Sequence, residues 1–137
     1  MDYVVLAFWV IQAAVGVALF VAWLRHGRGG SAGMVLTHVA LAIVGLALWI
    51  AFLATGAVLP AWLAFAALTV GNGVGDTMLV RRYRRTSGST DTFWKAYGGA
   101  IAATFRGALP RRVVFHALFA GVVYFTCLGV CIAASVA

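Results

Sequence analysis

Long, almost uncharged runs of apolar residues dominate this chain, and they constrain its fold more than any other feature. A helix needs about 20 residues to cross the hydrocarbon core of a bilayer. Four runs reach that length, at about 3–24, 34–54, 59–80 and 112–136. They are continuously apolar rather than alternating, which favours helices over the strands of a barrel. The sequence therefore predicts an all-α integral membrane protein: one membrane domain, residues 1–137, built as a four-helix bundle.

The composition excludes a globular domain with a water-exposed surface. Hydrophobic residues make up 64% of the chain and charged residues only 9%, with three acidic side chains in all. Soluble domains are about half apolar and about a quarter charged. So few charges could not solvate a surface of ordinary size, so most of this surface is expected to face lipid.

The basic residues predict how the chain is oriented. All ten fall in two regions, after the first and the third apolar run: Arg25, Arg28, Arg81, Arg82, Arg84, Arg85, Lys95, Arg106, Arg111 and Arg112. The positive-inside rule places both regions in the cytoplasm and both termini outside the cell membrane. Basic runs can also bind nucleic acid, but flanking membrane helices favour contact with anionic lipids instead. We therefore expect no nucleic-acid partner.

The four spans form two hairpins that resemble each other. Each hairpin runs from outside to inside, crosses a basic region, and returns with a histidine near the start of its second helix. Parallel repeats about an axis along the membrane normal are one way to build a central site. An internal repeat and chance similarity are both left open by these few identities.

The long basic region after the third span contains a further predicted helix, at about 91–109. Asp91 is placed to cap it, aromatic residues follow at helical spacing, and Pro110 is placed to end it. This pattern is typical of an amphipathic helix in the cytoplasmic headgroup layer. The alternative is a loop that packs beneath the bundle and shields a site.

His38 and His116 are the residues most indicative of function. Each lies about one turn inside an apolar span that starts on the basic side of the membrane. Ionisable residues inside the bilayer are rare and usually functional. Two imidazoles at one level on parallel helices predict the axial ligands of a single haem b. The alternatives are an interhelical hydrogen bond and another metal or ligand.

Other residues fit a porphyrin at this level. Gly45, seven positions beyond His38, shares its helix face and would let a flat ring approach the backbone. Four arginines at the same edge could pair with haem propionates: Arg81, Arg82, Arg111 and Arg112. Asp76 is interpreted as pairing with Arg81 or Arg82. Its alternatives are to accept the second imidazole proton of a ligating histidine or to relay protons.

Three tryptophans and two cysteines are interpreted as structural. Trp9, Trp49 and Trp62 lie toward the termini side of their spans, as interfacial tryptophans do. Cys127 and Cys131 are spaced i, i+4 and are expected to be small buried residues rather than a disulfide or a redox motif.

The two histidines and the four-span plan resemble the haem-bearing membrane anchors of respiratory dehydrogenases. That resemblance implies a small b-type cytochrome in which His38 and His116 ligate one haem near the cytoplasmic face. It further implies electron exchange with quinone or with a partner subunit. A non-catalytic accessory subunit of a larger complex is the main alternative, because the sequence shows no catalytic machinery, and a homodimer is a plausible assembly. A small transporter is less favoured, because the chain lacks the intramembrane glutamate of the small multidrug exporters.

Overall fold

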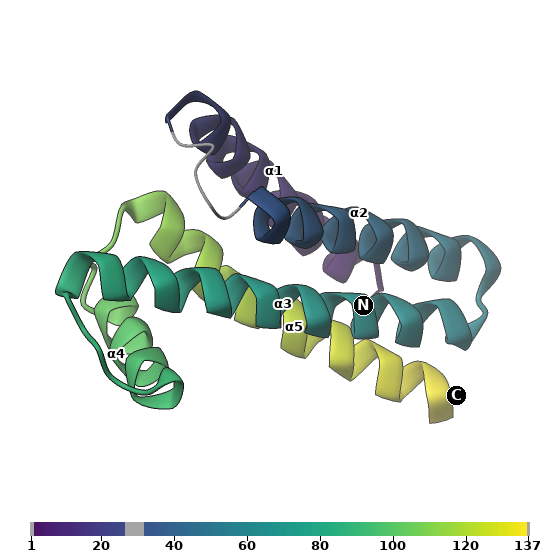
Figure 1. The fold of residues 1–137 in the computed structure, drawn as a ribbon. Coiled ribbons are helices and arrows are strands. Elements are labelled where there is room, and N and C mark those ends of the chain that lie inside the picture. The colour runs from purple at the N-terminus through teal and green to yellow at the C-terminus, as the bar shows by residue number, and fades with distance from the viewer. Residues whose placement is uncertain (1, 27–31, 137) are drawn as a thin grey trace.

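The protein is all-helical in a computed structural model, which describes residues 2–26 and 32–136 (Figure 1). Its five helices follow one another in the order α1 (Asp2–His26), α2 (Ala32–Thr55), α3 (Val58–Ser87), α4 (Phe93–Phe105) and α5 (Arg111–Val136). Four of them, α1, α2, α3 and α5, are long and apolar enough to cross a membrane, with mean hydropathies of 2.5, 2.3, 1.5 and 2.2 in their best windows. The predicted four spans and the helix after the third are confirmed. Arg28 lies outside the described residues.

The surface of these four helices is what a lipid-facing surface requires. Large apolar side chains are exposed on each of them: Val17 is 61% exposed, Ile43 64%, Val70 57% and Phe125 69%. A soluble monomer rarely leaves apolar patches of that extent uncovered. The length, the hydropathy and the exposed apolar surface of these helices therefore indicate a membrane protein.

Three glycines end helices by adopting the left-handed conformation that other residues avoid. Gly56, Gly88 and Gly107 have φ angles of 69°, 70° and 68°. The N–H of Gly56 donates to the carbonyl of Phe52, and that of Gly88 to the carbonyl of Arg84. Each bond satisfies a carbonyl of the last turn, which otherwise has no partner within its helix.

Two helix boundaries differ from those expected. The third helix runs to Ser87, seven residues past the expected end at 80, because the apolar run stops before the helix does. The helix α4 ends at Phe105 rather than at 109, because Gly107 reverses the chain before Pro110 is reached. Its N-cap is Thr92 and not Asp91.

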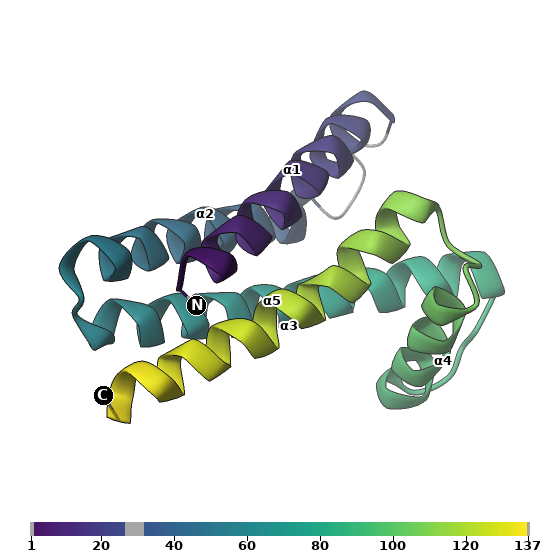
Figure 2. The same cartoon turned by 180° about the vertical axis from the view of Figure 1, so that it is seen from behind.

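The four long helices pack in a ring in which each touches two others. Helix α2 packs along α3, α1 packs against α5, and the contacts α1–α2 and α3–α5 close the ring (Figures 1 and 2). Over the described residues, no Cα of α2 lies within 8 Å of any Cα of α5, and the same holds for α1 and α3. Helices α2 and α5 are therefore diagonal partners across the centre.

Two separate groups of buried residues lie along the ring. The first, here the termini-end core, comprises Val5, Trp9, Trp49, Phe52, Ala61, Ala64, Val123, Cys127, Val130 and Cys131. The second, here the basic-end cluster, comprises Leu79, Val80, Ala96, Ala100 and Leu109, and so joins α4 to α3 and the chain before α5. Both termini lie at one end of the molecule and α4 lies at the other (Figure 1).

The inward faces of α2 and α5 have the same spacing. On α2 the buried residues Gly45, Trp49 and Phe52 lie 7, 11 and 14 positions beyond His38. On α5 the buried residues Val123, Cys127 and Val130 lie 7, 11 and 14 positions beyond His116, and Cys131, which is also buried, lies 15 positions beyond it. These offsets keep to one helix face. Each histidine therefore lies on the inward face of its helix, on the basic-end side of the termini-end core.

Candidate functional site

The side chains of His38 and His116 meet between the diagonal helices α2 and α5. Their ring centroids are 6.1 Å apart and their planes are inclined by 71°. His38 is six residues into α2 and His116 is five residues into α5. At 1.5 Å per residue, these positions differ in depth by only about one residue. The structure thus brings together the two histidines that the sequence singled out.

His38 is held in place by helix α3. Its Nδ1 lies 2.9 Å from the backbone oxygen of Gly71. Because a carbonyl can only accept, Nδ1 carries the proton in this contact and Nε2 keeps its lone pair. One turn further along α3, an added Cβ on Gly75 would lie 3.2 Å from Cε1 of His38. Helix α3 therefore holds this imidazole by a hydrogen bond at Nδ1 and by a close backbone at the adjacent Cε1.

His116 has a corresponding glycine on helix α1. An added Cβ on Gly16 would lie 3.3 Å from Cε1 of His116. The side-chain Nε2 of Gln12, one turn before Gly16, donates to the backbone oxygen of His116 over 2.8 Å. The two histidines come from the diagonal helices α2 and α5, and each imidazole packs on a glycine of the other diagonal pair. His38 packs on Gly75 of α3, and His116 packs on Gly16 of α1.

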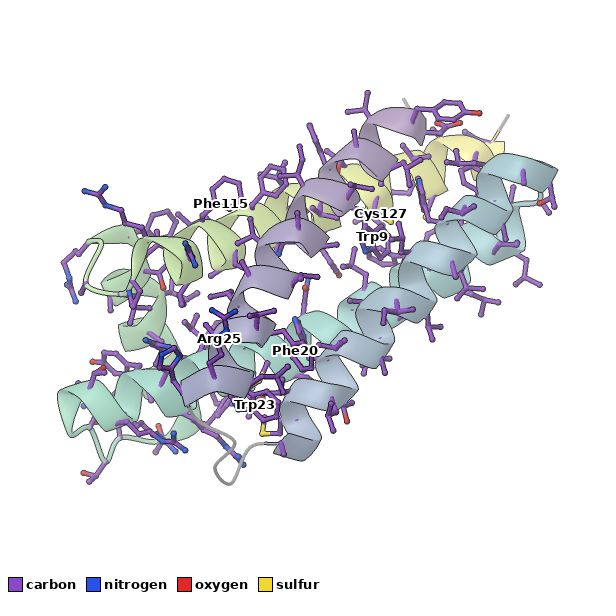
Figure 3. The ribbon with its side chains drawn as sticks, turned by 90° about the horizontal axis from the view of Figure 1, so that it is seen from above. Trp9, Phe20, Trp23, Arg25, Phe115 and Cys127 are labelled. Carbon is purple, nitrogen blue, oxygen red and sulfur yellow. The ribbon has the colours of Figure 1, made fainter. Side chains whose placement is uncertain are left out.

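Several buried polar atoms of the long helices lack hydrogen-bond partners. Within the part of the chain that the structure describes, they are His116 Nδ1, Gln12 Oε1 and Trp23 Nε1, with Arg84 Nε at the basic end. Trp23 lies seven residues past Gly16 on α1 and stacks on Phe20, with ring centroids 5.7 Å apart (Figure 3). Most buried polar groups are paired, so unpaired ones require an explanation. A group bound between the helices would be one such explanation.

The spacing of the imidazoles fits ligation of a single iron. With metal–nitrogen bonds of about 2 Å on both sides, two imidazoles on opposite faces of one metal have ring centres about 6 Å apart. Among residues 2–26 and 32–136, no group of three or more His, Cys, Asp or Glu could hold a bare metal ion. A porphyrin supplies four nitrogen ligands and needs two axial ligands, which is the number available. The two histidines therefore match the number of protein ligands that a haem iron needs.

Gly45 does not lie against the imidazoles. An added Cβ there would lie 2.8 Å from Cζ2 of Trp9, and Gly45 is buried beside the termini-end core. We expected Gly45 to make room for a porphyrin, but its missing side chain makes room for the Trp9 ring instead. The residues that approach the imidazoles closely are Gly16 and Gly75.

The four arginines expected at the propionates all have exposed side chains. Arg81 and Arg82 lie on the extended end of α3, and Arg111 and Arg112 form the first turn of α5. No contact in the described chain ties them to the histidine pair. Their role toward a ligand remains a prediction from sequence.

Asp76 contacts a residue that the sequence did not indicate. Its Oδ2 accepts a hydrogen bond of 3.3 Å from the hydroxyl of Tyr97 on α4. Among the described residues, Asp76 does not form the expected ion pair with Arg81 or Arg82. The Nδ1 proton of His38 is donated to the Gly71 carbonyl and not to Asp76. Asp76 therefore fastens α4 to the end of α3.

The remaining candidates have structural contacts. Cys127 and Cys131 are buried free thiols, as expected, and Cys131 Sγ lies 3.4 Å from the Ala61 carbonyl. Trp9 and Trp49 are 3% and 0% exposed, so they form core and not the expected membrane interface. His26 is exposed and bonds the Ala22 carbonyl of its own helix.

Sequence reasoning missed Gln12, Gly16 and the roles of Gly71 and Gly75 toward the histidines. Gly71 and Gly75 carry a weak signal, because their four-residue spacing is typical of close helix packing. A lone glutamine in an apolar span is the signal that Gln12 offered.

Comparison with known proteins gives no match to any family model, any curated protein or any solved structure.

Proposed function

We propose that this protein is a small membrane b-type cytochrome that holds one haem between His38 and His116. The observation that carries the proposal is the 6.1 Å separation of two imidazole centroids from diagonal helices. Packed helices stand about 8–10 Å apart, and a porphyrin would not fit between helices in direct contact. No Cα of α2 lies within 8 Å of α5 over their described lengths, so these two helices are not in direct contact.

The haem would supply a one-electron redox centre, and the protein would supply its ligands and its surroundings. Nε2 of His38 and Nε2 of His116 would be the atoms that hold the haem iron. The missing side chains of Gly16 and Gly75 would let the two imidazoles pack against α1 and α3. The apolar shell and the axial ligands together tune the potential of such an iron. Electrons would pass to or from quinone or a partner subunit, because one centre near one face cannot carry an electron across the membrane.

The architecture we propose is a four-helix bundle made of two related hairpins. The equal offsets of the inward residues from His38 and from His116 support an internal repeat. The matching glycine contacts of the two imidazoles support it as well. The basic residues favour an orientation in which α4 lies on the cytoplasmic side and both termini lie outside. On α4, Trp94 and Phe105 are 78% and 73% exposed, which suits a helix in the headgroup layer of anionic lipids.

The test is an absorption spectrum with three matched histidine variants. The protein is produced with ample haem, purified in detergent, and its dithionite-reduced spectrum is compared with its oxidised one. We expect the sharp bands of a six-coordinate haem b. His38→Ala and His116→Ala should each abolish them, and His26→Ala, which removes an exposed imidazole, should leave them unchanged.

A colourless wild-type protein would overturn the proposal and favour an accessory subunit. Retention of the bands in either His38→Ala or His116→Ala would overturn the assignment of these histidines as ligands.

A further inference from the structure

The two histidines are held differently at their Nδ1 atoms. Nδ1 of His38 has the Gly71 carbonyl as its partner, at 2.9 Å. Nδ1 of His116 is buried and has no partner among the described residues. If both rings ligate one iron through Nε2, both Nδ1 atoms carry a proton, and only one of these protons has an acceptor.

The missing acceptor lies on a residue that already contacts His116. Gln12 donates from Nε2 to the backbone oxygen of His116 over 2.8 Å, and its Oε1 is buried and unpaired. A side-chain amide has both donor hydrogens and an acceptor oxygen. One buried donor and one buried acceptor are thus left over on two residues that are already joined.

Pairing these two atoms would require rotation of the outer torsions of the two side chains. The outer torsions of glutamine and histidine side chains are broad rather than confined to narrow wells. Leaving a buried polar group unpaired is destabilising, so one hydrogen bond between these two atoms would satisfy both.

We infer that Gln12 is the positioning residue for His116, and that its Oε1 accepts the Nδ1 proton when Nε2 ligates the iron. This inference rests on the proposed haem site. Ligating histidines commonly donate their second N–H to a carboxylate, a carbonyl or water, which fixes the ring and raises its basicity. The Gly71 carbonyl does this for His38 and cannot be removed by substitution, so Gln12 is the side chain through which the pair can be tuned.

The inference predicts the direction of a redox shift. A more basic imidazole stabilises ferric iron more than ferrous iron, so losing the acceptor raises the midpoint potential. Changes to such outer partners alter metal affinity by about 10- to 100-fold. A tenfold loss confined to the ferric form corresponds to an upward shift of about 59 mV for one electron.

The experiment is a redox titration of the haem-loaded protein with three variants. Gln12→Leu removes the acceptor and should raise the midpoint. Gln12→Glu keeps an acceptor oxygen and should leave the midpoint at or below the wild-type value. The control Thr126→Val removes a hydroxyl on α5 that bonds only carbonyls of its own helix, and it should leave the midpoint unchanged.

The outcomes separate this inference from the proposed function. Haem-loaded protein in which Gln12→Leu leaves the midpoint unchanged, or in which both Gln12 variants shift it the same way, overturns the role of Gln12 and leaves the cytochrome standing. A shift of the midpoint in the same direction in both variants is what we expect if Gln12 only stabilises the packing of α1 against α5. A wild-type protein that binds no haem overturns both.

Discussion

Replacing Gly75 by alanine should weaken haem binding, because it moves the ring of His38. An added Cβ would lie 3.2 Å from Cε1 of this ring, whereas carbon atoms in good contact lie about 3.5–4.0 Å apart. The ring would have to shift by a few tenths of an ångström. It is tied by its 2.9 Å contact to the Gly71 carbonyl, one turn away on the same helix. A shift therefore strains that hydrogen bond or displaces Nε2 from the iron.

The size of the effect follows from the cost of overpacking. Extra carbon in a well-packed interior costs about 1–3 kcal/mol, which is about 5- to 150-fold in an equilibrium constant. Alanine is also more favourable than glycine in a helix by up to about 1 kcal/mol. A second Gly→Ala variant on the same helix is needed to control for that difference in helix stability. Gly73→Ala provides it, because nothing lies within 4 Å of its added Cβ and the position is exposed on the same helix.

The assay is titration of haem into the haem-free protein in detergent, followed by absorbance. Gly75→Ala should raise the dissociation constant by about 5- to 150-fold relative to Gly73→Ala. Helical content measured by circular dichroism should be the same in both. Equal haem affinities for the two variants would refute the argument that α3 positions His38.

Three further predictions concern the core, the short helix and the orientation. Gly45→Ala would bring a Cβ to 2.8 Å from the buried ring of Trp9, so thermal unfolding should show a loss of about 1–3 kcal/mol; unchanged stability would contradict the packing. Hydrogen bonds from Lys95 and Ser89 hold the pKa of Asp91 below its ordinary 3.8. The contribution of ionised Asp91 to the stability of α4 is therefore complete above pH 3.8, and it is lost as the pH falls through the lowered pKa. Fluorescence of the tryptophan on α4 should report a small change there, and Asp91→Asn should abolish it. In a cysteine-free background, Thr90→Cys should react with an impermeant thiol reagent only from the cytoplasmic side and Thr55→Cys only from outside; the reverse would overturn the orientation.

The number and position of the helices could be predicted from sequence, because uninterrupted apolar runs of spanning length have few alternative structures. Their ends could not. Helix α3 continues through its arginines to Ser87 because helical hydrogen bonding does not depend on hydropathy, and it stops where Gly88 turns left-handed. The end of α4 was misplaced because Pro110 is a strong signal and Gly107, which ends the helix earlier, was overlooked.

The histidine pair could also be predicted, because depth along two parallel helices follows from counting residues. Their surroundings could not, because these depend on how helices distant in sequence pack. Gln12 lies 104 positions from His116 and contacts it only because α1 packs against α5. Gly45 was misassigned for the same reason, since the Trp9 ring that fills its space lies on another helix.

The most direct test of the central claim is electron paramagnetic resonance of the oxidised, haem-loaded protein. Two imidazoles on one ferric iron make it low-spin, and ring planes inclined by 71° are close enough to perpendicular to give the strongly anisotropic signal of crossed axial ligands. We predict that signal in the wild-type protein and its loss in His38→Ala and His116→Ala. A high-spin ferric signal in the wild type, or no haem signal at all, would contradict ligation by this pair.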